Sequence, residues 1–212
     1  MVSFVVIPAF NEQDTIENVV KTASNHVQNI IVVNDCSTDN TEKLSLSAGA
    51  KVISLKKNKG YDFALEEGIN FALINGATSI LTLDADGQHP ESSIKPMINL
   101  INNENYDLVI GIRNEIPRLS EKIFAFFTNI IFGVEDITCG MKCYRAELLK
   151  KYGFGSKHKS IGTYLSLKVL KKSLKYKKFY IPVKRREDRS RIGMNIYAEF
   201  DIIWVMIKSI FY

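Results

Sequence analysis

The sequence predicts an α/β protein with a mostly parallel central sheet and helices on both faces. Short runs rich in β-branched residues alternate with helix-like segments through the first half of the chain. The runs are almost wholly apolar, as in strands that helices cover on both sides, and helical crossovers between them make the strands parallel. With 212 residues, 46% of them hydrophobic and 24% charged, the chain fits one globular domain.

The predicted elements follow one another without an internal repeat or a proline-rich linker. The predicted strands are SFVVIP (3–8), NIIVVN (29–34), KVISL (51–55), SILTLD (79–84), DLVIGI (107–112) and KFYIPV (178–183). The predicted helices occupy residues 13–26, 40–48, 61–75, 91–103, 118–134, 162–174 and 197–212. Residues 138–149 predict a strand or turn that leads into a short helix, and residues 184–193 predict a basic loop. We therefore expect a single domain over residues 1–212.

Charge divides the chain into two unlike halves. Residues 1–110 hold seven lysines, no arginine and fourteen acidic residues, a balance of −7, whereas residues 111–212 hold 21 basic and nine acidic residues, a balance of +12. The sum is the net charge of +5. An acidic half can hold cations and a basic half can hold phosphates or a membrane surface. The plain alternative is a set of solvated lysine-rich helices.

Cysteine use and hydropathy favour a cytoplasmic protein. The three cysteines, Cys36, Cys139 and Cys143, are odd in number, and no set of four zinc ligands is apparent. The N-terminus enters a strand pattern at once, unlike a secretion signal, and no apolar stretch reaches the roughly 18 to 20 residues that span a bilayer. Nothing in the sequence excludes a longer natural protein that continues into transmembrane helices.

Polar residues follow four of the predicted strands. The segments are PAFNE (8–12), NDCSTDNT (34–41), DADGQHP (84–90) and GIRN (111–114). Ligands of parallel sheets bind beyond the carboxyl ends of the strands, so these side chains are expected to share one rim. The glycine-rich fingerprints of dinucleotide-binding proteins and of P-loop NTPases are both missing, which argues against those two classes.

The segment DADGQHP predicts a divalent metal site. Asp84 and Asp86 offer carboxylates one residue apart and Gln88 adds an amide oxygen, a set that suits Mg²⁺ or Mn²⁺. The spacing does not fit an EF-hand. An ordinary Asp-Gly turn is the alternative interpretation. Asp35 and Glu12 also have two interpretations. Each can contact a ligand, or it can cap or favour the start of a helix.

Six segments in order resemble the family 2 glycosyltransferases with the GT-A fold. They are VVIPAFNE, VVND followed by STDNT, NKGYDFALEEGI (58–69), LDADGQHP, GIRN and DITCGMKCYR. The similarity covers nearly the whole chain and is greatest to dolichyl-phosphate mannose synthases and related polyprenyl-phosphate glycosyltransferases. It implies a nucleotide- and metal-binding half over residues 1–110 and an acceptor half over residues 111–212.

The resemblance also implies roles for individual residues. The residues implied to bind the nucleotide sugar are Pro8, Phe10, Glu12, Val33, Asp35, Asp84, Ala85, Asp86, Arg113, Arg185, Ser190 and Arg191. Asp84, Asp86 and Gln88 are implied to hold the cation, and the catalytic set is Asp84, Asp86, Arg113 and Asp136.

The chain departs from the family pattern at several positions. Phe10 stands where tyrosine is usual, Tyr61 and Asp62 stand where small residues are common, and Arg191 replaces lysine. Arg191 keeps the charge and adds bidentate phosphate geometry. An acidic residue common near GTYLSLK (162–168) is missing, which bears on the acceptor more than on the donor.

The predicted reaction moves a sugar from a GDP-mannose or UDP-glucose type donor to a polyprenyl phosphate. A lipid phosphate is already an anion at neutral pH and needs no strong base, whereas a saccharide or other hydroxyl acceptor would need one, for which Asp136 is the candidate. FAFFTNIIF (124–132) and FDIIWVMIKSIFY (200–212) are predicted to lie at the cytosolic face of a membrane, with core or dimer packing as the alternative. An inactive nucleotide-sugar binder and a basic nucleic-acid-binding protein are the other classes, although no nucleic-acid motif is present.

Overall fold

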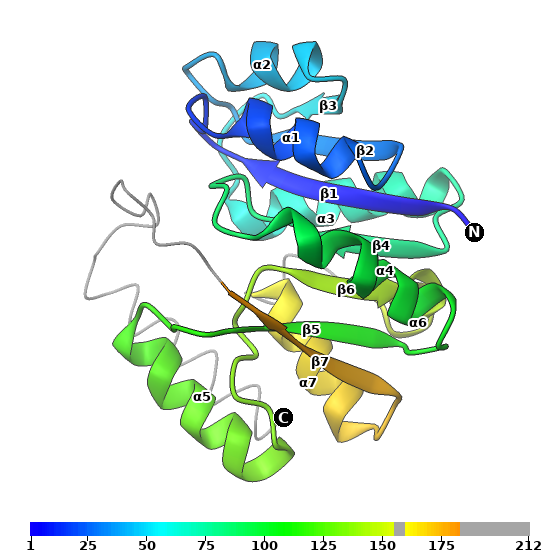
Figure 1. The fold of residues 1–212 in the computed structure, drawn as a ribbon. Helices are drawn as coiled ribbons and strands as arrows, with labels where there is room; N and C mark the ends of the chain where they lie inside the picture. The colour runs from blue at the N-terminus through cyan, green and yellow to red at the C-terminus, as the bar shows by residue number, and fades with distance from the viewer. Residues whose placement is uncertain (155–159, 183–212) are drawn as a thin grey trace.

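The computed structural model of the protein describes residues 1–154 and 160–182 (Figure 1). Its strands are β1 (Ser3–Ala9), β2 (Asn29–Asn34), β3 (Lys51–Ser54), β4 (Ser79–Thr82), β5 (Leu108–Arg113), β6 (Lys142–Arg145) and β7 (Tyr176–Ile181). Its helices are α1 (Ile16–Ser24), α2 (Thr41–Ser47), α3 (Tyr61–Ile74), α4 (Ile94–Asn102), α5 (Leu119–Phe132), α6 (Ala146–Tyr152) and α7 (Ile161–Lys171). A 3₁₀ turn, η1 (Glu91–Ser93), precedes α4.

The strands form one mixed sheet in the order β3-β2-β1-β4-β6-β5-β7. Strand β6 runs antiparallel to its neighbours β4 and β5, and every other pairing is parallel. Cys143 is the register partner of both Leu81 on β4 and Val109 on β5. The chain therefore inserts one reversed strand between two strands of the parallel set, and the predicted mostly parallel α/β class is confirmed.

The predicted strands are found with small changes at their ends. Strand β4 ends at Thr82, two residues earlier than predicted, although the Leu83 amide still donates to the Val6 carbonyl at 3.0 Å. Asp84 consequently leaves the sheet at its edge. Strand β6 lies in the segment that predicts a strand or turn. The predicted loop 184–193 and helix 197–212 lie outside the described residues, and the single domain over 1–212 stays a prediction.

Two apolar layers pack on opposite faces of the sheet. Successive side chains of β1 point to opposite sides, so Val6 joins the cluster that includes Leu65 of α3 while Val5 joins the cluster that includes Val20 of α1. A Cβ at Gly68 would overlap the side chain of Val6, so glycine allows α3 to lie close against β1. Helices on both faces of the central strands give the layered arrangement seen in Figure 1.

Helix α5 exposes much of its apolar surface. It buries Ser120, Phe124 and Thr128, and the Thr128 hydroxyl donates to the Val134 carbonyl at 2.8 Å. Its exposed apolar residues, between 43% and 72% accessible, are Leu119, Ile123, Phe126, Phe127, Ile130 and Ile131. Gly133 ends the helix in the left-handed conformation with φ of 67°. Among residues 1–154 and 160–182, no helix is long and apolar enough to cross a membrane.

Candidate active site at the carboxyl edge of the sheet

The loops after β1, β2 and β4 are tied together by hydrogen bonds. The Asp35 amide donates to the Ala9 carbonyl at 2.9 Å, which joins the loop after β2 to the end of β1. The Thr15 hydroxyl donates to the Ala85 carbonyl at 2.7 Å, which joins the start of α1 to the loop after β4. The predicted convergence is therefore confirmed for the carboxyl ends of β1, β2 and β4. These ends lie on the left of the view in Figure 1.

The residues predicted to line the nucleotide lie at this edge. Pro8 and Val33 are register partners on β1 and β2. Phe10 is 38% exposed, so part of its side chain is accessible. Glu12 is buried, and its amide donates to the Thr41 hydroxyl at 2.8 Å. Phe10 is thus accessible from solvent, whereas Glu12 belongs to the packed base of the loop.

Asp35 is a buried carboxylate that holds the start of α3. Its Oδ1 accepts from the Lys59 amide at 2.7 Å and its Oδ2 accepts from the Gly60 amide at 2.8 Å. Gly60 has φ of 88°, a conformation that favours glycine. Each Asp35 oxygen keeps a further lone pair, so the carboxylate can organise the loop and still accept from a ligand.

Asp84 has two side-chain donors, one on each oxygen. The Tyr61 hydroxyl donates to Oδ1 at 2.9 Å, and Nε2 of His89 lies 3.0 Å from Oδ2. Burial opposes the charged form of Asp84, but its hydrogen bonds and electrostatic interactions with His89, Tyr61 and Arg113 lower its pKa below the usual value. Burial, followed by the Asp84 charge, raises the pKa of Tyr61, so its hydroxyl remains protonated. Asp84 is therefore an anion whose orientation is fixed.

The backbone of Gly140 packs directly against the Asp84 carboxylate. A Cβ built on Gly140 would overlap both carboxylate oxygens and the carboxyl carbon of Asp84. This segment precedes β6, the reversed strand that returns beside β4. A glycine at this position is required because the backbone and the carboxylate are in direct contact.

Asp86 and Gln88 lie on the turn that follows. The Gln88 amide donates to Oδ1 of Asp86 at 3.0 Å, and Gly87 between them has φ of 73°. The sequence interpretation as an Asp-Gly turn and the interpretation as a ligand site are compatible, because the turn keeps Asp86 and Gln88 on the same short loop as Asp84.

The donor atoms of this loop fit a hard divalent cation. Asp84, Asp86 and Gln88 provide carboxylate and amide oxygens, the ligands that Mg²⁺ and Mn²⁺ prefer, and the Asp84 side chain is 28% exposed. In the described part of the chain, no three His, Cys, Asp or Glu side chains gather into a metal-holding group. Because three protein ligands do not fill six coordination positions, a cation held by Asp84, Asp86 and Gln88 would keep positions for ligand oxygens such as those of a diphosphate.

Arg113 and Asp136 form a second, closed charged site. Nε of Arg113 lies 2.6 Å from Oδ2 of Asp136, and one terminal nitrogen donates to Oδ1 of Asp136 at 3.0 Å. The same nitrogen lies 2.9 Å from Glu121 on α5 and 2.8 Å from the Thr138 hydroxyl. Arg113 is therefore shared between two carboxylates at the end of β5.

This pairing decides the ionisation of Asp136. Burial of Asp136 opposes its charge, but the hydrogen bonds and the charge of Arg113 lower its pKa below the usual value. Burial likewise opposes the charge of Arg113, and Asp136 outweighs it, so the pKa of Arg113 is raised. A carboxylate with a lowered pKa is a weak base, and in this arrangement Asp136 holds Arg113.

Two cysteines and a lysine behind the site are buried. Burial raises the pKa of Cys139 to about 12 and raises the pKa of Cys143 as well, so both are thiols at neutral pH. Nζ of Lys142 donates to the Cys139 carbonyl, and burial lowers the pKa of Lys142. The sequence does not indicate that this lysine is interior, because a lysine in a short strand normally faces water.

The sequence interpretation omitted several side chains that contact the predicted residues, among them Tyr61, His89 and Glu121. Tyr61 and His89 hold Asp84, and Glu121 holds Arg113. A signal existed for Tyr61, since it departs from the family pattern, and for His89, since it belongs to the DADGQHP segment. Arg185, Ser190 and Arg191, which were predicted to bind the diphosphate, lie outside the described residues.

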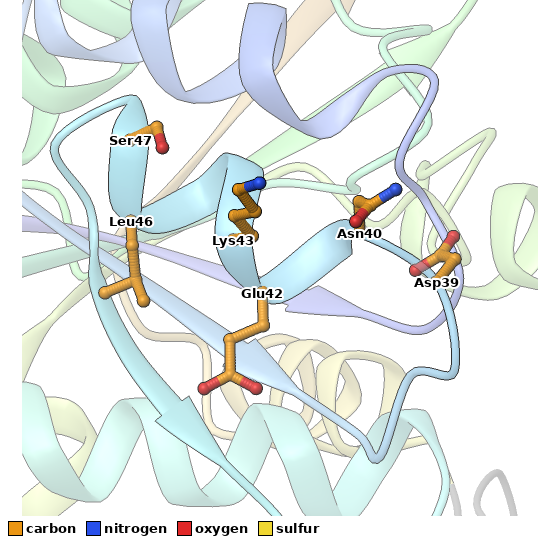
Figure 2. A pocket seen from close by; sticks show the side chains of 6 residues that line it. All are labelled: Asp39, Asn40, Glu42, Lys43, Leu46 and Ser47. Atoms are coloured by element: carbon orange, nitrogen blue, oxygen red, sulfur yellow. The ribbon is translucent and has the colours of Figure 1, made fainter.

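A hollow of about 440 Å³ lies elsewhere, on the surface of α2 (Figure 2). It is lined by Asp39, Asn40, Glu42, Lys43, Leu46 and Ser47. None of these is a predicted site residue. The candidate active site lies instead at the strand ends, where the loops after β1, β2 and β4 meet.

Comparison with known proteins identifies the family. Residues 4–153 match the glycosyl transferase family 2 model. The chain is a family 2 glycosyltransferase. It is 29% identical to the UDP-N-acetylglucosamine–dolichyl-phosphate N-acetylglucosaminyltransferase of Methanococcus voltae, an alignment that covers 96% of this chain and 94% of that protein. It is 31% identical to the dolichyl-phosphate hexose transferase of Haloferax volcanii, over 68% of this chain and 67% of that protein.

A solved structure shares the fold of this glycosyltransferase. Glucosyl-3-phosphoglycerate synthase from Mycobacterium tuberculosis, crystallised with Mn²⁺, UDP and glucosyl-3-phosphoglycerate, superposes with a TM-score of 0.79 at 21% sequence identity. The match covers 98% of this chain and 79% of that chain. The fold is therefore GT-A, as expected, and the relatives confirm the resemblance to the polyprenyl-phosphate branch of the family.

Proposed function

We propose that this glycosyltransferase moves a sugar from a nucleoside diphosphate sugar to a polyprenyl phosphate at a membrane surface, with Mg²⁺ or Mn²⁺. The observation that carries the proposal is the fixed, ionised Asp84 at the carboxyl edge of the sheet, on one loop with Asp86 and hydrogen-bonded through Ala85 to the start of α1. An anionic, partly exposed group at this edge is suited to a cation and the diphosphate that accompanies it.

The nucleoside is assigned to the ends of β1 and β2. Phe10 offers a ring face for stacking, and Asp35 keeps free lone pairs for donors of a base or ribose. Pro8 and Val33 supply the backbone surface between them. These groups bind and orient, and they leave the choice between guanine and uracil open to experiment.

The diphosphate is assigned to the loop after β4. Asp84, Asp86 and Gln88 would hold the cation, which when bound supplies Lewis-acid stabilisation of the charge on a departing nucleoside diphosphate. Ala85 lies between the two acids. Arg185, Ser190 and Arg191 are proposed from the family pattern to close over the phosphates.

Arg113 and Asp136 are assigned a supporting role. Arg113 lies near enough to Asp84 to lower its pKa, and it is held by Asp136 and Glu121. Its positive charge therefore contributes to the field in which the donor diphosphate would bind. Because Asp136 is paired with a guanidinium and has a lowered pKa, an acceptor that is already an anion suits the site better than a hydroxyl that needs a base.

Helix α5 supports a lipid acceptor. Its apolar face is exposed, its Glu121 contacts Arg113 at the end of β5, and residues 111–212 carry a charge balance of +12. An apolar helix face beside basic segments is typical of proteins that lie on anionic membranes. The dolichyl-phosphate transferases of Methanococcus voltae and Haloferax volcanii, to which the chain is similar, point to the same class of acceptor.

A thermal-shift screen tests the donor assignment. GDP, UDP, GDP-mannose and UDP-hexoses are added with Mn²⁺ or Mg²⁺, and a single-stranded oligonucleotide serves as the competing ligand. A ligand at one hundred times its Kd stabilises the fold by about 2.7 kcal/mol, which raises Tm by about 5–10 °C for a chain of this size. Stabilisation by one nucleoside diphosphate family supports the proposal, whereas a response to the oligonucleotide alone would refute it.

A further inference from the structure

Four consecutive residues, Lys59–Asp62, contact three separate parts of the enzyme. Their amides and side chains reach the end of β2, the loop after β4 and the start of α7. The partners are Asp35, Asp84 and the first residues of α7, which are 24, 23 and about one hundred positions away along the chain. The segment that leads into α3 and forms its first turn is therefore joined by long-range hydrogen bonds to three other parts of the fold.

The centre of this segment is the contact between Tyr61 and Asp84. The Tyr61 hydroxyl donates to Oδ1 of Asp84 at 2.9 Å, while His89 occupies Oδ2 at 3.0 Å and Gly140 lies beneath the carboxylate. Tyr61 approaches from the start of α3, whereas His89 lies on the same loop as Asp84. Tyr61 is therefore the donor that fixes Asp84 relative to a different element of the sheet edge.

Both neighbours of Tyr61 are themselves held. On one side Asp35 accepts from the amides of Lys59 and Gly60 at 2.7 and 2.8 Å. On the other side Asp62 accepts from the amides of Ser160 and Ile161 at 2.7 and 2.9 Å. The backbone on both sides of Tyr61 is consequently held in place, so the tyrosine projects from a fixed position at the start of α3.

We propose that Tyr61 is a positioning residue of the donor site, which orients the Asp84 carboxylate toward the cation and diphosphate and is itself held in place by Asp62. The inference rests on the proposed function, because it assigns Tyr61 to the same diphosphate site. A phenol, unlike a lysine or arginine, fixes a carboxylate without cancelling its charge.

The test measures nucleotide affinity by titration calorimetry, with Mn²⁺ and separately with EDTA. The proteins are the wild type, Tyr61→Phe, Asp62→Asn and the double variant, and the ligand is the nucleoside diphosphate that stabilises the wild type most. Losing a hydrogen bond to a charged group corresponds to about tenfold. Tyr61→Phe should therefore weaken Mn²⁺-dependent binding about tenfold and leave binding in EDTA within about twofold, with Tm within about 3 °C of the wild type.

The double variant tests whether Asp62 acts through Tyr61. Asp62→Asn should give a smaller loss than Tyr61→Phe, and the double variant should bind like Tyr61→Phe alone, because coupled residues are not additive. Unchanged Mn²⁺-dependent affinity in Tyr61→Phe would overturn the inference, as would equal losses with and without metal or additive losses in the double variant. If the wild type binds no nucleoside diphosphate, the proposed function fails instead, and the two failures are distinguishable.

Discussion

Asp84 lies just after β4, and Asp136 contacts Arg113 at the end of β5. The surroundings of these two carboxylates differ in kind. Asp84 is 28% exposed and is held by a phenol and an imidazole. Asp136 is fully buried and is held by the guanidinium of Arg113. The phenol of Tyr61 fixes the direction of the Asp84 carboxylate without a formal charge of its own, whereas the guanidinium of Arg113 both fixes and neutralises Asp136. The surroundings of Asp84 suit ligand binding, whereas those of Asp136 suit a structural role.

The largest expected difference between the two acids is in stability. Asp136→Asn leaves Arg113 facing an amide in a buried site, and removal of one member of a buried pair typically lowers the free energy of unfolding by about 3 kcal/mol. Urea unfolding at pH 7 measures this loss. Asp84→Asn is the matched change at a partly exposed site, for which a loss below about 1 kcal/mol is expected. Equal losses for the two variants would contradict the contrast.

A methyl group added at Gly140 tests whether Asp84 must keep its position. Gly140→Ala places a carbon against the Asp84 carboxylate, and such overpacking typically corresponds to about 1–3 kcal/mol. We expect about tenfold weaker Mn²⁺-dependent binding of nucleoside diphosphate, measured by calorimetry. Gly162→Ala is the control, because its added carbon would lie no closer than 3.4 Å to Lys142 or Tyr144. Normal binding by Gly140→Ala would show that Asp84 need not keep its position.

The closed site also connects to the exposed face of α5 through Glu121. If that face meets lipid, Phe126→Ser should weaken sedimentation with anionic vesicles about fivefold, because an apolar side chain is removed from the interface. Ile74→Ser, at an 85% exposed position near the end of α3, is the matched control and should have no effect. Equal effects of the two substitutions, or none from either, would exclude α5 as the lipid-facing element.

The smallest effect is expected in the acid range. The pKa of Asp136 is lowered in the folded state, chiefly because Arg113 outweighs the opposing influence of burial. The stability gained from its ionisation is complete above the ordinary aspartate pKa and is lost as pH falls through the lowered folded value. Unfolding measured from pH 7 downward should therefore show a steeper loss in the wild type than in Asp136→Asn. Parallel curves would mean that Asp136 is not the ionised partner.

Much of the donor side was predictable from the sequence. The strands β1, β2 and β4 are apolar β-branched runs, and the parallel arrangement brings their polar ends together, so Asp35 and Asp84 were expected at one edge. Local pattern was sufficient here because each strand is followed directly by its polar segment. The family resemblance then gave those polar ends their implied roles.

The acceptor side was less accessible to sequence reasoning. The contact of Arg113 with Asp136 requires the chain to return through α5 and insert β6 antiparallel between β4 and β5. Helix α5 is apolar on several sides, so its periodicity cannot tell which face is buried, and the structure buries Ser120 and Thr128 while exposing Phe126. The contact between Tyr61 and Asp84 likewise depends on the tertiary position of α3.

The most direct test of the central claim is sugar transfer itself. Purified protein is mixed with a labelled UDP- or GDP-sugar, polyprenyl phosphate in vesicles and Mn²⁺, and the sugar recovered in the organic phase is counted. The wild type is expected to make a lipid-linked sugar, and Asp86→Ala is expected to make essentially none while remaining folded by circular dichroism. Transfer by Asp86→Ala at the wild-type rate, or no lipid-linked product from the wild type with any of these donors, would contradict the assignment.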